Sequence, residues 1–316
     1  MSASRAVGID IGGTKIAALR VSSEGDIEAT EVIPSPASDQ DEALPAIEAA
    51  AGAVLDDTVV AIGVGMAGLV DVRTGVLLAT PNLVWRKLPI AERLHAAFGL
   101  RVTVDNDATA AAWGESRLGA SRGYDESLFV GVGTGIGGGI VTGGRLLRGS
   151  HGLAGEVGHV IVEPDGPECG CGNRGCWEQV ASGPAIARAG GRAVLEEPRS
   201  RIARLAGGDP RRATGELVTD AARAGDLVAV AILAEVGRRL GEGVAGLVNV
   251  LDPEIVVIGG GAGEAGDLLL APLRDAFDET VEGADVRPEV PIVPAALGND
   301  AGAIGAALLA LEAVAG

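Results

Sequence analysis

The sequence contains the same short arrangement twice: an apolar run, a turn rich in glycine, and a second apolar run. The first copy, VGIDIGGTKI, covers residues 7–16, and the second, FVGVGTGIGGGI, covers residues 129–140. Apolar runs on both sides of a glycine turn predict two strands joined by a tight turn. One copy opens each half of the chain. We therefore expect two similar α/β lobes that face each other across a cleft and offer one turn each to the same ligand.

The composition supports a folded protein with a large core. Apolar residues make up 47% of the 316 residues, which excludes an intrinsically disordered chain, and the length suits two lobes. The apolar spacing predicts strands at 59–64, 101–104, 127–132 and 255–258, and helices at 40–55, 90–98, 107–118, 227–251, 267–281 and 299–314. Residues 196–215, rich in Pro and Arg, are expected to form a solvated, mobile excursion between helices, with an anion patch as the alternative.

Charge and hydropathy exclude several classes of function. The formal net charge is −18, and a strongly acidic surface would repel the phosphate backbone of a nucleic acid. The sequence has no run of 18 apolar residues, so we expect no membrane span. The first residues, MSASR, form no apolar signal segment, so we expect the protein in the cytoplasm. Neither a nucleic acid nor a membrane is therefore an expected partner.

Residues 10–15, DIGGTK, are the first candidate for a phosphate site. Gly12 and Gly13 allow backbone N–H groups to approach phosphate oxygens, and Thr14 adds a hydroxyl. Asp10, at the end of the first strand, is well placed to hold Mg²⁺ or its water. A plain hairpin with an incidental Asp is the alternative. The second glycine turn, at 133–139, favours the phosphate interpretation.

Two segments also match the glycine pattern of dinucleotide-binding proteins, GTGIGG at 133–138 and GAGEAG at 261–266. The first precedes strand-like sequence rather than a helix, so a pyrophosphate group would lack its usual helix N-terminus. The second lies between a strand and a helix, but no strand that ends in an acidic residue follows at the required distance. We therefore do not expect an NAD-dependent enzyme.

A third candidate lies at residues 102–107, VTVDND, where a strand ends with two acids and an amide just before a helix. In a phosphoryl transferase, a carboxylate at such a point can accept the proton of an attacking hydroxyl. Asn106 and Asp107 are also favourable residues at the N-terminus of a helix. The two roles are compatible, and the sequence leaves both open.

The most specific pattern is the combination of His159 with Cys169, Cys171 and Cys176, which are all the cysteines of the chain. One imidazole and three thiols suit tetrahedral Zn²⁺, and four protein ligands leave no position open for water. Three cysteines this close together do not suit a disulfide framework. We therefore predict a structural zinc site, with three buried reduced thiols as the alternative.

Together these motifs resemble the ROK family (repressor, open reading frame, kinase) of sugar kinases, within the actin-like ATPase superfamily. The resemblance covers essentially the whole chain. The matching segments are the first phosphate motif at 10–15, the zinc signature at 156–159 and 169–178, and an adenosine-contacting glycine turn at 256–261. Residues 79–85 and 176–178 are most similar to the bacterial glucokinase branch of the family. Ala67 and Thr109 depart from the pattern, since many members have Pro and Asn there.

The resemblance implies an α/β fold of the two-lobed, actin-like (ribonuclease H-like) ATPase type, with duplicated α/β domains around a cleft. The N-terminal lobe is expected at residues 1–118. The C-terminal lobe is expected at 119–298 and contains the zinc loop. The last helix, within 299–316, is expected to return to the N-terminal lobe.

The resemblance also implies roles for individual residues. Asp107 matches the general base that takes the proton of the sugar 6-hydroxyl. The residues that match sugar ligands are Gly68, Asn82, Asn106, Asp107, Glu156, His159 and Glu178. The residues that match the ATP-binding segments are Asp10, Gly12, Gly13, Thr14, Lys15, Gly133, Thr134, Gly135, Gly259, Gly260 and Gly261. Zinc on His159, Cys169, Cys171 and Cys176 would act indirectly, by fixing the loop that carries the two glutamates.

The implied function is phosphorylation of glucose at its 6-hydroxyl by ATP and Mg²⁺, the first step of glycolysis, in a homodimer or homotetramer. Mannose, N-acetylglucosamine or N-acetylmannosamine as substrate, and polyphosphate as donor, stay open. The family also contains transcription repressors, whose DNA-binding helix-turn-helix segment precedes the phosphate motif. Because Asp10 is the tenth residue here, we expect no such segment. A non-catalytic regulator that senses a sugar is the alternative.

Overall fold

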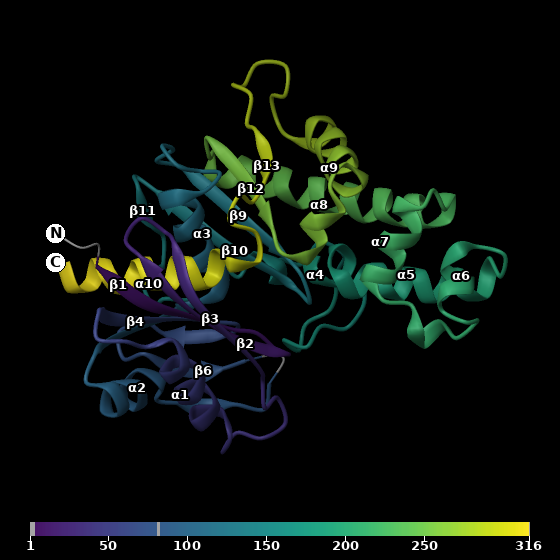
Figure 1. The fold of residues 1–316 in the computed structure, drawn as a ribbon. Coiled ribbons are helices and arrows are strands. Elements are labelled where there is room, and N and C mark those ends of the chain that lie inside the picture. Colours follow the sequence, from purple (N-terminus) through teal and green to yellow (C-terminus); the bar gives the residue numbers. More distant parts are fainter. Residues whose placement is uncertain (1–3, 81–82, 316) are drawn as a thin grey trace. The chain divides into compact units, whose positions relative to one another are not determined.

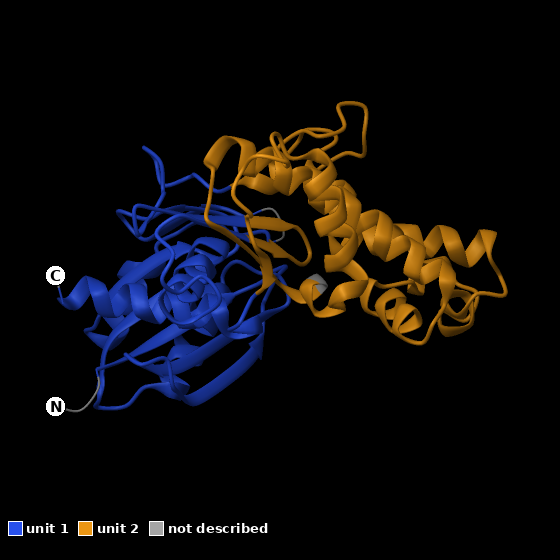
Figure 2. Cartoon of the chain, turned by 90° about the horizontal axis from the view of Figure 1, so that it is seen from above, with its two compact units in different colours: residues 1–129, 138–155, 295–316 blue, residues 130–137, 156–294 orange. Residues whose placement is uncertain are grey.

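A computed structural model describes residues 4–80 and 83–315 of the chain (Figure 1). The chain divides into two compact units (Figure 2). Unit 1 comprises residues 1–129, 138–155 and 295–316, and unit 2 comprises residues 130–137 and 156–294. The chain first passes between the units within β9 (Ser127–Val132) and β10 (Ile136–Thr142), the two strands of the second repeat. Both units contain helices and strands.

Unit 1 is built on a five-stranded sheet with the order β3-β2-β1-β4-β8. Pairing is antiparallel between β1 and β2 and between β2 and β3, and parallel between β1 and β4 and between β4 and β8. These strands are β1 (Arg5–Ile11), β2 (Lys15–Ser22), β3 (Ile27–Pro34), β4 (Val59–Met66) and β8 (Arg101–Asn106). The central strands β1 and β4 are almost continuously buried, as expected of strands covered on both faces.

Two pairs of helices cover this sheet. The pair α1 (Ala43–Val54) and α2 (Ile90–Phe98) contributes to one apolar cluster, and α3 (Asp107–Leu118) and α10 (Ala301–Ala315) contribute to another. Helix α10 lies directly on β1 and β4, as Figure 1 shows. A Cβ atom at Gly8 would lie 1.9 Å from the Ala303 carbonyl oxygen, and one at Gly63 would lie 1.8 Å from that of Ala306. The two glycines therefore permit this close packing.

The rest of unit 1 consists of short strands. A three-stranded antiparallel sheet contains β5 (Leu69–Asp71), β6 (Val76–Ala79) and β7 (Arg86–Leu88), and β11 (Arg145–Leu146) pairs with β10. The sequence did not predict the small sheet, because three or four residues are too few to show a periodicity. This sheet matters for the site because Gly68 immediately precedes β5.

Unit 2 contains the parallel pair β12 (Ile255–Gly259) and β13 (Ile292–Pro294), within a sheet of order β11-β10-β9-β12-β13. Its longest helix, α8 (Leu227–Leu251), begins where the Asp226 side chain accepts a hydrogen bond from the Ala229 amide. The other helices are α4 (Trp177–Ala181), α5 (Gly183–Glu196), α6 (Arg201–Leu205), α7 (Gly215–Arg223) and α9 (Asp267–Thr280). Helices α8 and α9 pack along each other.

The predicted helices and strands are confirmed, with shifts of a few residues at their ends. Residues 196–215, expected to be a solvated, mobile excursion between helices, are largely exposed but contain helical structure of their own. This segment contains α6 and a 3-10 turn at Pro210–Arg212, and the side chain of Ile202 is buried. Ser200 caps α6 by accepting a hydrogen bond from the Ala203 amide. No helix in the described part of the chain is long and apolar enough to cross a membrane.

Candidate active site

The first glycine turn connects β1 to β2 and is held by its own backbone and by Ser35. The Gly12 amide donates to the Lys15 carbonyl oxygen at 3.0 Å, and the Ser35 hydroxyl donates to the Gly12 carbonyl oxygen at 2.8 Å. The Ser35 amide also donates to the Thr14 carbonyl oxygen at 3.0 Å. Ser35 was not predicted, because a lone serine after β3 carries no signal in the sequence.

Asp10 lies near the end of β1, where burial and two nearby carboxylates act on its side chain. Burial raises its pKa to about 7, and the nearby carboxylates of Asp107 and Asp300 add to the effect, while Lys15 opposes it. The first turn of α10 also approaches this carboxyl, because a Cβ at Gly302 would lie 3.2 Å from the Asp10 carboxyl carbon. Neighbouring carboxylates of this kind suit a divalent cation such as Mg²⁺.

Asn106 and Asp107 mark the point where β8 ends and α3 begins. The Asn106 side-chain oxygen accepts a hydrogen bond from the Thr109 amide at 3.0 Å, so Asn106 caps the helix. Its side-chain nitrogen donates to the Gly68 carbonyl oxygen at 3.4 Å, which joins two of the predicted sugar ligands. The capping role therefore falls to Asn106 and leaves Asp107, the first residue of the helix, available for chemistry.

The Asp107 side chain is half-buried and close enough to Asp10 for the two carboxyl groups to interact electrostatically. Burial raises the pKa of Asp107, and a hydrogen bond from the Ala108 amide, 2.9 Å from the carboxylate oxygen, works in the opposite direction. A carboxylate with a raised pKa accepts a proton more readily than a solvated one. The environment of Asp107 is thus that of a possible general base.

In unit 2, the second glycine turn lies against two other predicted segments. The Gly133 amide donates to the Gly135 carbonyl oxygen, and the Gly183 amide donates to the Gly133 carbonyl oxygen, both at 2.9 Å. A Cβ at Gly135 would lie 2.5 Å from a Glu178 carboxylate oxygen. Gly260, with a φ of 79°, lies close to the end of β9, because a Cβ at Gly260 would be 2.6 Å from the Val132 carbonyl oxygen. Two of the predicted nucleotide turns are therefore neighbours.

His159, Cys169, Cys171 and Cys176 form one cluster, with ligand atoms that all lie within 4.8 Å of one another. The Cys169 Sγ to His159 Nδ1 distance and the Cys171 Sγ to Cys176 Sγ distance are both 3.6 Å. A zinc tetrahedron with ordinary Zn–S and Zn–N bonds has edges of about 3.6–3.8 Å. The donor set and its spacing therefore fit Zn²⁺.

The three thiols differ in the direction of their pKa shifts. Burial works to raise the pKa of Cys171, but hydrogen bonds, first of all one with the Asn173 backbone, lower it overall. Burial raises the pKa of Cys169 to about 12, and burial also raises the pKa of Cys176. The Cys169 thiol donates to Glu178 Oε1 at 3.0 Å. A metal ion would displace these protons, since the thiolate is the form that ligates. Gly175 is required in the loop, because a Cβ there would lie 1.5 Å from the Glu163 carbonyl oxygen.

The predicted sugar ligands of unit 2 meet around His159. Its Nε2 lies 3.8 Å from Glu156 Oε2, and its Nδ1 lies 3.8 Å from Glu178 Oε1. Nδ1 is also the ring atom that faces Cys169. The imidazole therefore presents one nitrogen to the thiols and the other toward Glu156. Asn82, the remaining predicted sugar ligand, lies outside the described residues.

A comparison with family models places almost the whole chain in one family, since residues 6–313 match the model described as the ROK family. The chain belongs to the ROK family. It is 42% identical over 308 residues to a glucokinase of Streptomyces coelicolor, which covers 97% of each chain, and 40% identical over 256 residues to a glucokinase of Thermotoga maritima, which covers 81% of this chain and 80% of the relative.

A solved structure supports the same relation. A ROK glucokinase from Streptomyces griseus, in complex with glucose and AMPPNP, matches 98% of this chain and 100% of its own with a TM-score of 0.91 and 41% identity. This likeness confirms the predicted α/β class and the actin-like ATPase fold. The expected membership of the ROK family is confirmed as well.

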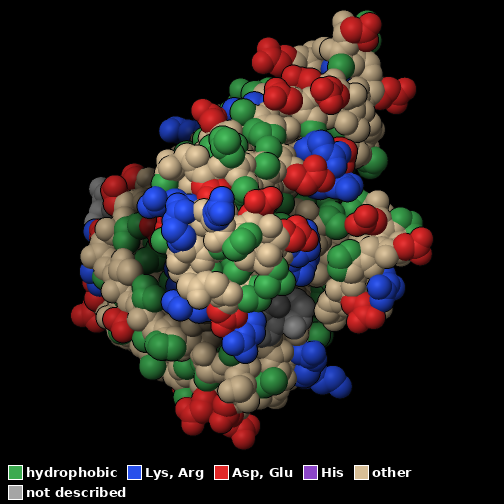
Figure 3. Space-filling model, turned by 90° about the vertical axis from the view of Figure 1, so that its right-hand side faces the viewer, with side chains coloured by type: hydrophobic (Ala, Val, Ile, Leu, Met, Phe, Trp, Pro, Cys, Tyr) green, Lys and Arg blue, Asp and Glu red, His purple; other side chains and the backbone are tan. Residues whose placement is uncertain are grey.

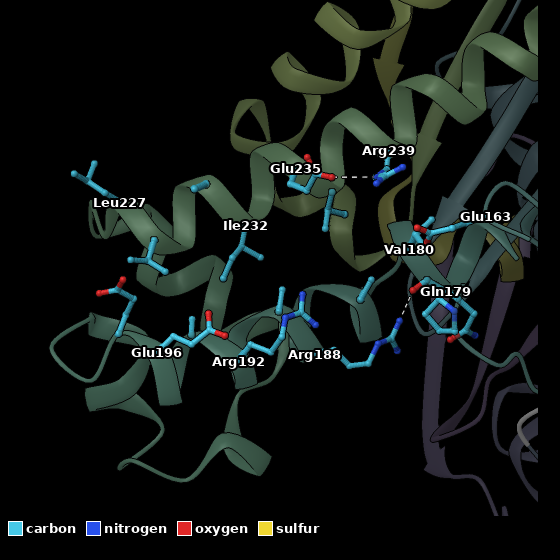
Figure 4. A pocket seen from close by; sticks show the side chains of 18 residues that line it. Glu163, Gln179, Val180, Arg188, Arg192, Glu196, Leu227, Ile232, Glu235 and Arg239 are labelled. Atoms are coloured by element: carbon cyan, nitrogen blue, oxygen red, sulfur yellow. Dashed lines mark hydrogen bonds and ion pairs between the residues drawn. The ribbon is translucent and has the colours of Figure 1, made fainter. Parts of the chain in front are cut away.

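Unit 2 of this ROK protein also contains a cavity of about 730 Å³ between α5 and α8 (Figure 4). Alanine, valine and isoleucine side chains line it together with Arg188, Arg192, Glu235 and Arg239. None of the predicted site residues that the structure describes lines this cavity. The face in Figure 3 shows acidic and basic side chains interspersed, without a broad basic area among the residues drawn in colour.

Proposed function

We propose that the protein phosphorylates glucose at its 6-hydroxyl with ATP as the donor. The main support is the similarity of this chain, over nearly the full length of both chains, to a glucokinase whose structure contains glucose and the ATP analogue AMPPNP. The similarity to curated glucokinases at 40–42% identity supports the same activity. The half-buried carboxyl of Asp107, free of the capping role, supplies the group that this chemistry needs.

In this proposal Asp107 accepts the proton of the 6-hydroxyl as the oxygen bonds to the γ-phosphorus and the bond to the β-phosphate oxygen breaks. Asn106 and Gly68, which are joined by a hydrogen bond, hold sugar hydroxyls from unit 1. Glu156, His159, Glu178 and Asn82 complete the sugar ligands. Buried polar groups matched to sugar hydroxyls give selectivity, because a substrate that lacks a partner leaves them unsatisfied.

The glycine turns of the two units hold the nucleotide: Gly12, Gly13, Thr14 and Lys15 in unit 1, and Gly133, Thr134, Gly135 and Gly259, Gly260 and Gly261 in unit 2. Backbone N–H groups of such turns bind phosphate oxygens. Asp10 holds Mg²⁺ or its water, and the cation neutralises charge on the phosphates. Zinc at the cluster of His159 and the three cysteines keeps the loop that carries Glu156 and Glu178 in one conformation.

A coupled assay of ADP release, with a panel of hexoses and with ATP or polyphosphate as donor, tests the proposal. We expect the highest kcat/KM for glucose with ATP. A much higher value for N-acetylmannosamine would contradict the glucose assignment and leave a hexose kinase. Sugar binding without turnover of any hexose would favour a non-catalytic regulator instead. Light scattering on the same sample measures whether the enzyme is the expected homodimer or homotetramer.

A further inference from the structure

Asp105, two residues before the proposed base, is a buried carboxylate with both oxygens engaged. Its side chain is 8% exposed. Oδ1 accepts a hydrogen bond from the Asn106 amide at 2.9 Å, and Oδ2 accepts one from Arg148 Nε at 2.9 Å while Arg148 Nη2 lies 2.8 Å away. Burial raises the pKa of Asp105, and the Arg148 guanidinium opposes that rise. The carboxylate thus links an arginine to the backbone of the turn that carries Asp107.

Arg148 is also the first residue of a closed loop, residues 148–155. Its carbonyl oxygen accepts a hydrogen bond from the Ala154 amide at 3.1 Å, which brings the two ends of the loop together. Gly152, with a φ of 75°, lies against the Val72 side chain next to β5, since its Cβ would be 3.1 Å from Cγ2. The residue that follows the loop is Glu156, a proposed sugar ligand. One arginine therefore joins the turn before α3 to the segment that ends at Glu156.

We propose that Asp105 and Arg148 are positioning residues, which together set the backbone at Asn106 and Asp107 and fix the loop that leads to Glu156. The pair itself does not touch the reacting atoms. It acts through the base on one side and through a sugar ligand on the other. This role rests on the proposed function, because it assigns what the two residues do for phosphoryl transfer to a sugar.

A positioning role predicts a different pattern of kinetic losses from a role in stability alone. A lower folded fraction reduces the apparent kcat and leaves both KM values unchanged. Displacement of the base and of the loop reduces kcat and raises the KM for glucose, and a displacement of about 1 Å can cost on the order of 100-fold in rate. The KM for ATP should stay within about twofold, because in the described part of the chain the side chains of Asp105 and Arg148 hydrogen-bond to each other and to the Asn106 amide rather than to the proposed nucleotide turns.

The test compares Arg148→Ala, Arg148→Lys, Asp105→Asn and the double variant Asp105→Asn/Arg148→Ala, with rates divided by the folded fraction from circular dichroism. We expect Arg148→Ala and Asp105→Asn each to lower kcat by roughly 10–100-fold and to raise the KM for glucose. Arg148→Lys should recover part of the loss, since lysine keeps the charge but not the two N–H groups of the guanidinium edge. The double variant should lose no more than the worse single variant.

Arg93→Ala is the matched control, because Arg93 forms an ion pair with Glu48 at 2.7 Å on the surface of the same unit. It should leave kcat and both KM values unchanged. An unchanged glucose KM in Arg148→Ala, or losses that add in the double variant, would overturn the positioning role while wild-type turnover of glucose kept the proposed function. A wild-type protein that phosphorylated no hexose would instead overturn the function itself.

Discussion

Replacing Gly305 by alanine tests how tightly α10 packs against α3. A Cβ at Gly305 would lie 1.7 Å from the Ala110 carbonyl oxygen and 2.9 Å from the Gly114 amide nitrogen. Both are backbone atoms of α3, so no side-chain rotation can relieve the contact. The closest approach must lengthen from 1.7 Å to at least about 3.4 Å, the lower end of an ordinary contact, which requires the two helices to separate.

The size of the effect follows from two opposing contributions. Alanine favours a helix over glycine by about 1 kcal/mol. Overpacking that forces side chains and backbone to shift typically costs about 1–3 kcal/mol and occasionally more, and here the contact is with backbone atoms. Separation of α10 from α3 also loosens the buried contacts of Ile304 and Ala307. We therefore expect an overpacking cost of at least about 3 kcal/mol, a net loss of at least about 2 kcal/mol, and a fall in Tm of roughly 4–8 °C for a unit of this size.

The matched control is Gly52→Ala, in α1 of the same unit. Gly52 is also inside a helix, but its Cβ would meet only the Phe98 ring at an ordinary 3.7 Å. The same gain in helix propensity applies, so this variant should melt a few degrees above wild type, about 2–4 °C. Thermal unfolding followed by circular dichroism measures both. A Gly305→Ala protein that melted at or above the wild-type temperature would refute the packing argument.

Three further predictions concern the site. Asp107→Asn keeps the shape of the side chain but not the proton acceptor, so kcat in the ADP-release assay should fall by at least ~100-fold with an unchanged circular dichroism spectrum, and a variant with half the activity would disprove the base. Cys171→Ser, or treatment with a chelator, should raise the KM for glucose while most helices stay formed. Elemental analysis should then find no zinc in the protein. Full activity without zinc would contradict a structural metal. Asp10 has a folded-state pKa of about 7, above its ordinary value of 3.8, so in metal-free buffer its contribution to stability is present at low pH and is lost as the pH rises from about 4 to about 7. The neutral Asp10→Asn variant should lose this slope in urea unfolding, and parallel curves for the two proteins would show that Asp10 does not titrate in this range.

The parts of the site that could be predicted from the sequence are local in the chain. The first turn depends on a hydrogen bond from Gly12 to Lys15, three residues away. The metal cluster draws all its ligands from residues 159–176, so spacing and residue type were sufficient to find it. The glycine turns and the acid-amide-acid end of β8 were found for the same reason. Physical contacts made within one turn or one loop leave a pattern in consecutive residues.

The pair of Asp105 and Arg148 could not be found in that way. The two residues are 43 positions apart, and each looks unremarkable in its own segment. In the sequence, Asp105 is one of the two acids at the strand end that precedes a helix, and Arg148 belongs to none of the motifs. The contact exists because β8 and the loop after β11 come together in unit 1. Only the topology of the sheet, with β8 at its edge, determines that approach.

Glu115 shows most clearly what the apolar spacing of a helix leaves out. It lies in α3, among alanines, where a glutamate would ordinarily face water. Instead it is 1% exposed, and its carboxylate accepts hydrogen bonds from the amides of Ala120 at 2.6 Å, Ala296 at 3.1 Å and Leu297 at 2.8 Å. These amides belong to the end of α3 and to the approach to α10, and a buried amide without a partner is costly. The Glu115 carboxylate thus provides hydrogen-bond acceptors for amides of both segments. It thereby fixes α3, the helix that begins with Asp107, against the segment that leads to α10.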